Sequence, residues 1–488
     1  MSNQTLKQRT ISGMVWVGIQ KFGILSITFL SNIILARLLT PDDYGMVGIL
    51  TVFIAVSNNF VDGGFGSALI QKTNPTQSDY TTVFYWNIIL GCFLYTLLYI
   101  TAPWIETFYH NIHGLAYILR VQGIIIVINA LTIVQFTKLR KAMQFKLLAR
   151  LNVYSAISSV LIAIFMAYRG YGVWALVMQQ ITLSISNVLL LWYFYGWRPI
   201  GGIKKESIKE LFGFGSFIFF ANILNTLGNN INSVLIGKFF STSTLGYFTQ
   251  AKKIEDVSSL GLLTVVEQVT YPMLVEVKDN FPRMARILEK FNNILLAITM
   301  PLMYCIFLLA KPIILFLFSE KWLPSVPMLQ IMCIYGIFIC MQGSNYNAIA
   351  AIGKSRVVFN WTIIKRSVNI TILLIMLSLW NFTGFLWGIV INAIFITFCN
   401  MYLVAKYIEF SLYNQLKALL PICLITTLPF IICYIICQIN IWNISSDINN
   451  FLSVLIYIVI YLSILWYAPF KLIREVKQEI INILKRFR

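Results

Sequence analysis

Apolar runs of transmembrane length recur along this 488-residue chain, and they constrain its fold more than any other feature. An α-helix needs about 20 apolar residues to cross the ~30 Å hydrocarbon core of a bilayer. The runs are continuous rather than alternating, which favours helices over the strands of a β-barrel. Only 11% of the residues are charged, too few to cover a water-facing surface. We therefore expect an all-α, polytopic membrane protein.

The runs predict fourteen transmembrane helices, and an even number of spans places both termini on one side of the membrane. Most of the 37 Lys and Arg residues, among them Lys365, fall in the loops, nearby helix ends and tail on that side. The positive-inside rule makes it the cytoplasmic side, so the net charge of +19 reflects topology and we expect no nucleic-acid partner. The predicted spans lie near residues 11–37, 44–69, 80–104, 115–137, 150–168, 171–195, 211–238, 245–272, 289–317, 326–351, 356–379, 383–405, 416–438 and 450–468.

A helical hairpin occurs twice in the sequence, half a chain apart. Residues 32–50 are NIILARLLTPDDYGMVGIL, and residues 236–251 are IGKFFSTSTLGYFTQA. In the first copy Pro41 ends the incoming helix, and the Asp side chains that follow can cap the outgoing helix. An internal duplication is therefore predicted. The copies align at a spacing of 201 residues (238 − 37), which pairs Arg37 with Lys238, Thr40 with Ser241 and Gly45 with Gly246.

A second internal similarity supports the duplication. Residues 170–180, GYGVWALVMQQ, open the sixth predicted span with a glycine turn, and residues 382–392, FTGFLWGIVIN, open the twelfth in the same way. Six spans return the chain to the same side, so the repeats are parallel. We expect a MATE-like arrangement of two six-helix lobes with two extra C-terminal helices. The predicted domains are 1–200 (first to sixth spans), 201–410 (seventh to twelfth spans) and 411–488 (last two spans and a basic cytoplasmic tail).

Polar side chains on the first and seventh predicted spans form matching stripes. Lys21 lies about 15 Å into the first span, and a cation at that depth should face the bundle interior or a wet cavity. Helical phase puts Thr28 and Asn32 on the same face. The stripes predict a substrate cavity between the lobes; the alternative is that amides join helices together in the membrane. Shifted by 201 residues, the face falls on Asn222, Asn229 and Ser233 of the seventh span, and Asn225 and Asn232 extend this second stripe.

The eighth predicted span carries a cluster of charges. We predict that its two lysines help to bind substrate and that its three acids exchange protons or sodium ions, because charges in a span usually mark a water-filled path. Asp62 of the second span is a further candidate for ion coupling. The alternative is a self-neutralised structural ion pair. The members of the cluster are Lys252, Lys253, Glu255, Asp256 and Glu267.

The chain lacks the motifs of several enzyme classes. It has no Walker A sequence, no G-x-G-x-x-G after a strand and no Cys/His cluster with zinc spacing. We therefore expect no cofactor, no metal site and no catalytic residue.

Three segments of the first half resemble the polysaccharide exporter family. These are ARLLTPDDYGMVGI (36–49), DGGFGSALIQ (62–71) and TVFYWN (82–87). The family comprises the Wzx-type flippases of O-antigen, colanic-acid and teichuronic-acid-like repeat units, within a superfamily that includes the MATE drug exporters and the lipid II flippases. The resemblance covers essentially the whole chain.

The resemblance implies a flippase of the bacterial cytoplasmic membrane. Its substrate would be an undecaprenyl-pyrophosphate-linked oligosaccharide, moved from the inner to the outer leaflet by alternating access, with a polysaccharide polymerase complex as a further partner. Two other classes stay open. A MATE-type exporter of small molecules has the same two lobes, and a membrane-embedded polysaccharide polymerase or ligase has similar hydropathy but needs a large outer loop that this chain lacks.

Overall fold

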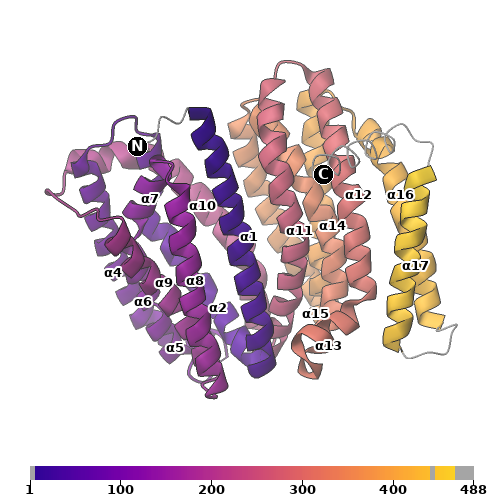
Figure 1. Cartoon of the computed structure of the whole chain (residues 1–488), viewed down its shortest axis with the longest axis horizontal. Helices are drawn as coiled ribbons and strands as arrows, with labels where there is room; N and C mark the ends of the chain where they lie inside the picture. Colours follow the sequence, from indigo (N-terminus) through magenta and orange to yellow (C-terminus); the bar gives the residue numbers. More distant parts are fainter. Residues whose placement is uncertain (1–5, 111, 440–445, 468–488) are drawn as a thin grey trace. The chain divides into compact units, whose positions relative to one another are not determined.

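The computed structural model of the chain describes residues 6–110, 112–439 and 446–467, which are helical with short connections and contain no strand. A 3₁₀ turn, Glu320–Trp322, joins α13 to α14. The helices, shown in Figure 1, are α1 (Leu6–Leu38), α2 (Pro41–Asp62), α3 (Phe65–Gln71), α4 (Gln77–Phe108), α5 (Leu115–Gln122), α6 (Ile124–Ala130), α7 (Ile133–Lys141), α8 (Phe145–Tyr168), α9 (Val173–Phe194), α10 (Lys205–Phe239), α11 (Thr242–Glu276), α12 (Phe281–Leu308), α13 (Ala310–Phe318), α14 (Ser325–Ala351), α15 (Ser355–Ile408), α16 (Leu412–Ile439) and α17 (Ser446–Tyr467).

The expected all-α membrane fold is confirmed. Within the described residues, 10 helices are long and apolar enough to cross a bilayer, or up to 11 if the bent group α5–α7 is one span. α10 and α11 are each 35 residues long, and the described parts of these two helices do not meet the same criterion. The count of fourteen spans therefore stays a prediction.

The predicted span 115–137 is not one continuous helix. The chain forms α5, α6 and α7 instead, and the last break bends the path by 40°. At that break the Thr132 hydroxyl donates a hydrogen bond to the Asn129 carbonyl at 2.8 Å. A side chain that bonds its own backbone in this way competes with the helical ladder and favours a bend.

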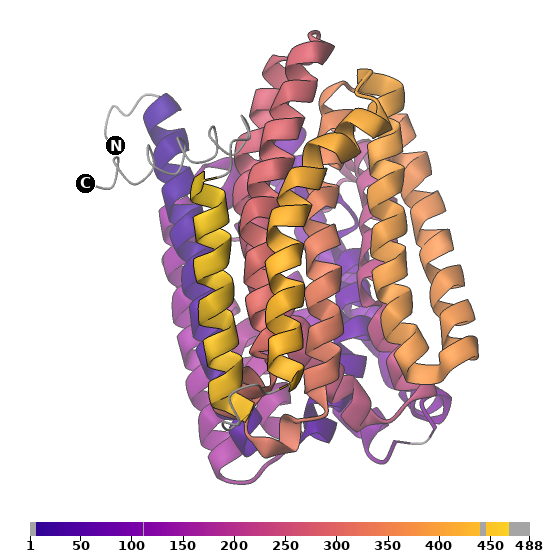
Figure 2. The ribbon, with the colours of Figure 1, turned by 90° about the vertical axis from the view of Figure 1, so that its right-hand side faces the viewer.

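Helix α15 is two helices joined by a sharp bend, as the orange hairpin in Figure 2 shows. The bend lies at Trp380 and Asn381, which leave helical geometry, so the predicted glycine turn at the start of the twelfth span was wrong. Gly384 is helical instead, and a Cβ there would overlap the Met376 carbonyl oxygen. Its role is to let the two halves approach closely. The matching turn before α9 is confirmed, with Gly170 and Gly172 both at positive φ.

The chain divides into two compact units, Met1–Thr249 and Gln250–Arg488. In the first unit α1 lies against α8, and α8 lies against α9 (Figure 1). In the second unit α14 packs on α15 and on α12, and α16 packs on α17 (Figure 2). The boundary predicted at residue 200 separates the two sequence repeats and not the two compact units, and it stays a prediction.

Candidate functional site

The two copies of the repeated hairpin pack against each other within the first unit. A Cβ on Gly45 of α2 would overlap the backbone carbonyl oxygen of Thr242, and a Cβ on Gly246 of α11 would overlap that of Pro41. Pro41 and Thr242 are themselves 201 residues apart, as are the two glycines. The contact is therefore self-complementary, in the manner of a two-fold symmetric dimer interface. We call these four residues the glycine junction.

Both helix starts at the junction are capped by a hydroxyl, and the first also has a reciprocal bond to a carboxylate. Thr40 accepts a hydrogen bond from the Asp43 amide at 3.3 Å, and the Asp43 carboxylate accepts one from the Thr40 amide at 2.8 Å. This capping box confirms the predicted helix start. In the second copy the Ser241 hydroxyl oxygen accepts from the Thr244 amide at 3.2 Å.

Asp42 joins the two copies instead of capping its own helix. Its Oδ1 accepts hydrogen bonds from the hydroxyls of Thr242 and Ser243, the second at 2.8 Å. The carboxylate of the first copy is thus satisfied by hydroxyls of the second. Hydrogen bonds to a charged acceptor are stronger than neutral ones, so these bonds stabilise the closed junction.

Close contacts continue between α10 and the helices α2 and α3. A Cβ on Gly64 would overlap the Gly215 carbonyl oxygen, and one on Gly237 would lie 2.9 Å from Ile49. Between these points the Asn59 amide donates to the Thr226 hydroxyl at 2.7 Å. Small residues and an interhelical hydrogen bond are the usual means of joining helices in a membrane.

A polar cluster fixes the start of α10. Ser207 donates a hydrogen bond to the buried Asp79 carboxylate at 2.7 Å, and Lys72 lies 3.1 Å from the same carboxylate. Lys72 also donates to Glu210 at 2.8 Å, and this bond raises the pKa of Lys72. This cluster was not predicted from the sequence. Lys72 and Asp79 follow the DGGFG segment closely, and Ser207 and Glu210 lie in the first turns of α10.

The charges of α11 form a compact triad in the second unit. The Lys252 ammonium lies 2.5 Å from both the Glu255 and the Asp256 carboxylates. Glu255 is fully buried and also accepts a hydrogen bond from Ser259 at 2.5 Å. Gly336 of α14 makes room for it, because a Cβ there would lie 2.9 Å from the carboxylate. We call Lys252, Glu255 and Asp256 the α11 triad.

The triad geometry favours the structural reading of these charges. One cation faces two acids, so Lys252 is neutralised within its own helix. The ammonium also lies 5.0 Å from the centre of the Tyr335 ring, a favourable cation–π distance. Substrate binding by Lys252 and Lys253 and ion coupling by Glu255 and Asp256 stay predictions. Lys253 is half-buried, and the side chain of Glu267 lies outside the described residues.

The predicted stripes differ in exposure along their length. Lys21 and Thr28 are exposed on α1, whereas Asn32 is buried. The Thr28 hydroxyl donates to the Ile24 carbonyl of its own helix at 2.8 Å. On the α10 stripe, Asn222 is half-buried, whereas Asn225 and Asn229 are exposed.

Asp62 has a local role at the end of α2. The backbone turns at Gly63 and Gly64, both at positive φ, before α3 begins. An ideal Cβ on Gly66 would lie 2.8 Å from the Asp62 carboxylate, so the acid sits against the first turn of α3. A carboxylate at a helix start is stabilised by the unpaired amides there. Ion coupling by Asp62 stays a prediction.

Comparison with solved structures defines the fold class. The lipid II flippase MurJ, in an inward closed conformation, superimposes with a TM-score of 0.75 at 14% identity, covering 93% of this chain and 99% of that chain. An inward-facing MATE family multidrug resistance transporter of the MOP superfamily gives 0.63 at 15% identity, covering 82% and 99%. The predicted MATE-like fold is confirmed.

The family follows from the sequence comparisons. The model of the polysaccharide biosynthesis protein family matches residues 34–327, more than half of the chain, and the chain belongs to this family. The teichuronic acid biosynthesis protein TuaB of Bacillus subtilis (strain 168) is 26% identical over 362 residues, which are 73% of this chain and 74% of TuaB. The predicted resemblance to the exporter family is confirmed.

Proposed function

We propose that the chain is a flippase that moves an undecaprenyl-pyrophosphate-linked oligosaccharide from the inner to the outer leaflet of the bacterial cytoplasmic membrane. The observation that carries the proposal is membership of the polysaccharide biosynthesis family in a chain with the fold of MurJ. Such a protein serves export of lipopolysaccharide O-antigen, capsule or exopolysaccharide. It is a transporter rather than an enzyme, with both termini in the cytoplasm and a polymerase complex as a further partner.

The substrate chemistry agrees with the polar residues of α1 and α10. A pyrophosphate carries several negative charges, and a cation in a low-dielectric site stabilises it more strongly than one in water. Lys21 supplies that cation on α1. Amide side chains such as Asn222 and Asn229 both donate and accept, which suits sugar hydroxyls.

The glycine junction supplies the outer gate of this mechanism. With the termini in the cytoplasm, Gly45 and Gly246 lie at the outer ends of their helices. Alternating access requires a contact that closes one side and separates when the other side closes. The junction suits that role because it consists of backbone contact and a few hydrogen bonds, which part without unfolding either helix.

The proposal includes ion coupling, in which the exchange of protons or sodium ions drives the return step. The acids that would carry it are Glu255, Asp256, Glu267 and Asp62. Transport in sealed vesicles should then respond to an imposed proton or sodium gradient. Transport that is insensitive to both gradients would remove coupling while leaving the flippase intact.

The test of the proposal is the distribution of lipid-linked oligosaccharide between leaflets in a strain without the gene. We expect accumulation on the inner leaflet and recovery when the wild-type chain is supplied. Lys21→Ala should abolish recovery at normal expression, Lys21→Arg should retain part of it, and Lys278→Ala, in an exposed turn, should recover fully. Full recovery by Lys21→Ala would exclude Lys21, and normal leaflet distribution in the deleted strain would exclude the function.

The other two classes fit less well. A MATE-type exporter would share the fold, but the family match is to polysaccharide biosynthesis. Sensitivity of the deleted strain to organic cations, with normal polysaccharide, would favour the exporter. A polymerase or ligase would need a large outer loop, and the connections between described helices are short.

A further inference from the structure

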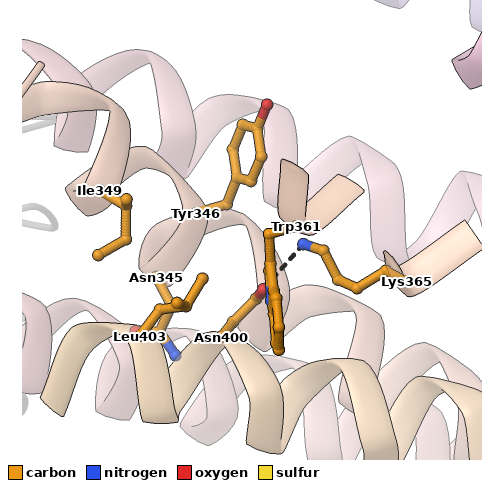
Figure 3. A pocket seen from close by; sticks show the side chains of 7 residues that line it. All are labelled: Asn345, Tyr346, Ile349, Trp361, Lys365, Asn400 and Leu403. Carbon is orange, nitrogen blue, oxygen red and sulfur yellow. Dashed lines mark hydrogen bonds between the residues drawn. The ribbon is translucent and has the colours of Figure 1, made fainter. Parts of the chain in front are cut away.

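A buried lysine lies in a small pocket of the second unit, among residues that the proposed function does not use. Figure 3 shows the pocket between α14 and the two halves of α15. The pocket is small, with room for about one ligand of the size of a water molecule or a monatomic ion. The lining residues are Asn345, Tyr346, Ile349, Trp361, Lys365, Asn400 and Leu403.

Lys365 carries an uncompensated charge in this pocket. The residue is only 9% exposed and lies ten positions beyond the first residue of α15. Its ammonium donates to the Asn400 Oδ1 at 3.0 Å and lies 5.4 Å from the centre of the Tyr346 ring. None of the described lining residues is acidic. A cation within a membrane span is costly unless an anion or water accompanies it.

A hydrogen-bond chain fixes the orientation of the Asn345 amide. The Ser344 hydroxyl donates to the Asn292 Oδ1 at 2.7 Å, so the Asn292 amide nitrogen is the donor to the Asn345 Oδ1 at 3.2 Å. The Asn345 nitrogen is left without a partner, although the residue is only 1% exposed. Leaving a buried donor without a partner is unfavourable, which favours a ligand beside it.

Donors predominate among the unused polar groups of the pocket. The Asn400 amide nitrogen donates to the Gln342 carbonyl at 3.2 Å, which directs its oxygen toward Lys365. The Trp361 indole N–H has no hydrogen-bond partner among the described residues. The amide oxygens of Asn345 and Asn400 are both engaged, whereas N–H groups of Lys365, Asn345 and Trp361 remain. A water molecule donates hydrogen bonds as well as accepting them, and it would leave the Lys365 charge without a counter-charge. An anion only accepts hydrogen bonds and supplies that counter-charge.

We propose that this pocket binds one small anion with the size and charge of chloride. The anion neutralises Lys365 inside the membrane and accepts hydrogen bonds from residues of α14 and of the first half of α15. It therefore joins α14 to the first half of α15. The site is too small for a sugar or a pyrophosphate, so it does not depend on the proposed flippase activity.

The first test is thermal unfolding of the purified full-length protein in detergent. Sodium chloride, sodium bromide and sodium gluconate are titrated at constant ionic strength. Binding to the folded state alone raises the Tm with ligand concentration. We expect a saturable rise of a few degrees with chloride and bromide and no rise with gluconate. Equal Tm values in the three salts would overturn the proposal.

Variants assign the effect to the pocket. Lys365→Met keeps the length of the side chain without its charge and should abolish the chloride-dependent shift, whereas Asn345→Leu should weaken it. Lys406→Met is the matched control, because Lys406 is exposed near the end of the same helix and should keep the full shift. A shift that survives in Lys365→Met would overturn the proposal even if chloride stabilises the wild type.

Crystals soaked in bromide give a test that does not depend on stability. We expect an anomalous peak within hydrogen-bond distance of the Lys365 ammonium. A pocket that holds water alone, or the phosphate of a bound lipid, would contradict the proposal. The wild-type measurements stand by themselves if a variant fails to fold.

Discussion

Helices α2 and α11 begin alike and then diverge. Each starts with a hydroxyl cap, at Thr40 or Ser241, and each places a glycine against the backbone of the other at the glycine junction. Farther along, α11 carries the α11 triad, whereas the residues 201 positions earlier in α2 are Thr51, Ile54 and Ala55. At these positions one copy is uncharged and the other is charged.

The comparison shows which features a duplicated contact can change. The backbone approach is limited by sterics, and only a residue without a Cβ fits at Gly45 and Gly246. Side-chain chemistry is less constrained, because a pair needs complementary groups rather than identical ones. Asp42 and the hydroxyls of Thr242 and Ser243 are such a pair, since the acid occurs in one copy and the donors in the other.

The largest effect is expected from filling the glycine junction. Gly45→Val or Gly246→Val puts side-chain atoms where a backbone carbonyl now lies, and no rotamer avoids the overlap. We expect a loss of about 4 kcal/mol or more in stability, or a junction held apart, and in either case loss of export. Tm and complementation measure this, with Gly213→Ala, where a Cβ meets open space, as the control. A Gly45→Val variant with the wild-type Tm and full complementation would contradict the self-complementary contact at the glycine junction.

An intermediate effect is expected from the α11 triad. Lys252→Met leaves the buried Glu255 carboxylate without its cation, which should cost about 3–5 kcal/mol. Grafting the α2 residues as the triple variant Lys252→Thr, Glu255→Ile and Asp256→Ala removes the charges together and should restore most of the stability. If the triple variant still transports substrate, the role of the α11 triad is structural. A stable but inactive triple variant would assign it to substrate or ion movement.

The smallest effect is expected from Asp42. Asp42→Ala removes the bonds from Thr242 and Ser243, each worth about 1.5–3 kcal/mol at most for a charged acceptor and less where the pair is partly exposed. In a double-mutant cycle with Ser243→Ala we expect a coupling of about 1 kcal/mol and a shift toward the outward-open state. Asp43→Ala is the comparison, because it removes only the local cap. A coupling of zero would mean that the hydroxyls do not hold the junction.

Sequence reasoning found the elements better than it found the contacts. The helix stop at Pro41 was visible in residues 32–50, the 201-residue spacing came from comparing them with residues 236–251, and the family likeness came from three segments between residues 36 and 87. The break at Thr132 was missed because the bend depends on a hydroxyl bonding its own backbone, which hydropathy does not report. Lys365 was counted with the cytoplasmic helix ends, although it lies about as deep in its predicted span as Lys21. The depth criterion applied to Lys21 would have singled it out.

The sequence by itself determined where the chain forms helices, that these helices suit a bilayer, and that one hairpin occurs twice. These properties depend on neighbouring residues along the chain, through hydropathy, capping and turn chemistry. Only the tertiary structure decided that Gly45 meets Thr242, that Lys252 is neutralised by its own helix, and that Lys365 has no acid beside it. Those facts depend on which helix faces bring distant residues into contact, and packing alone sets that choice.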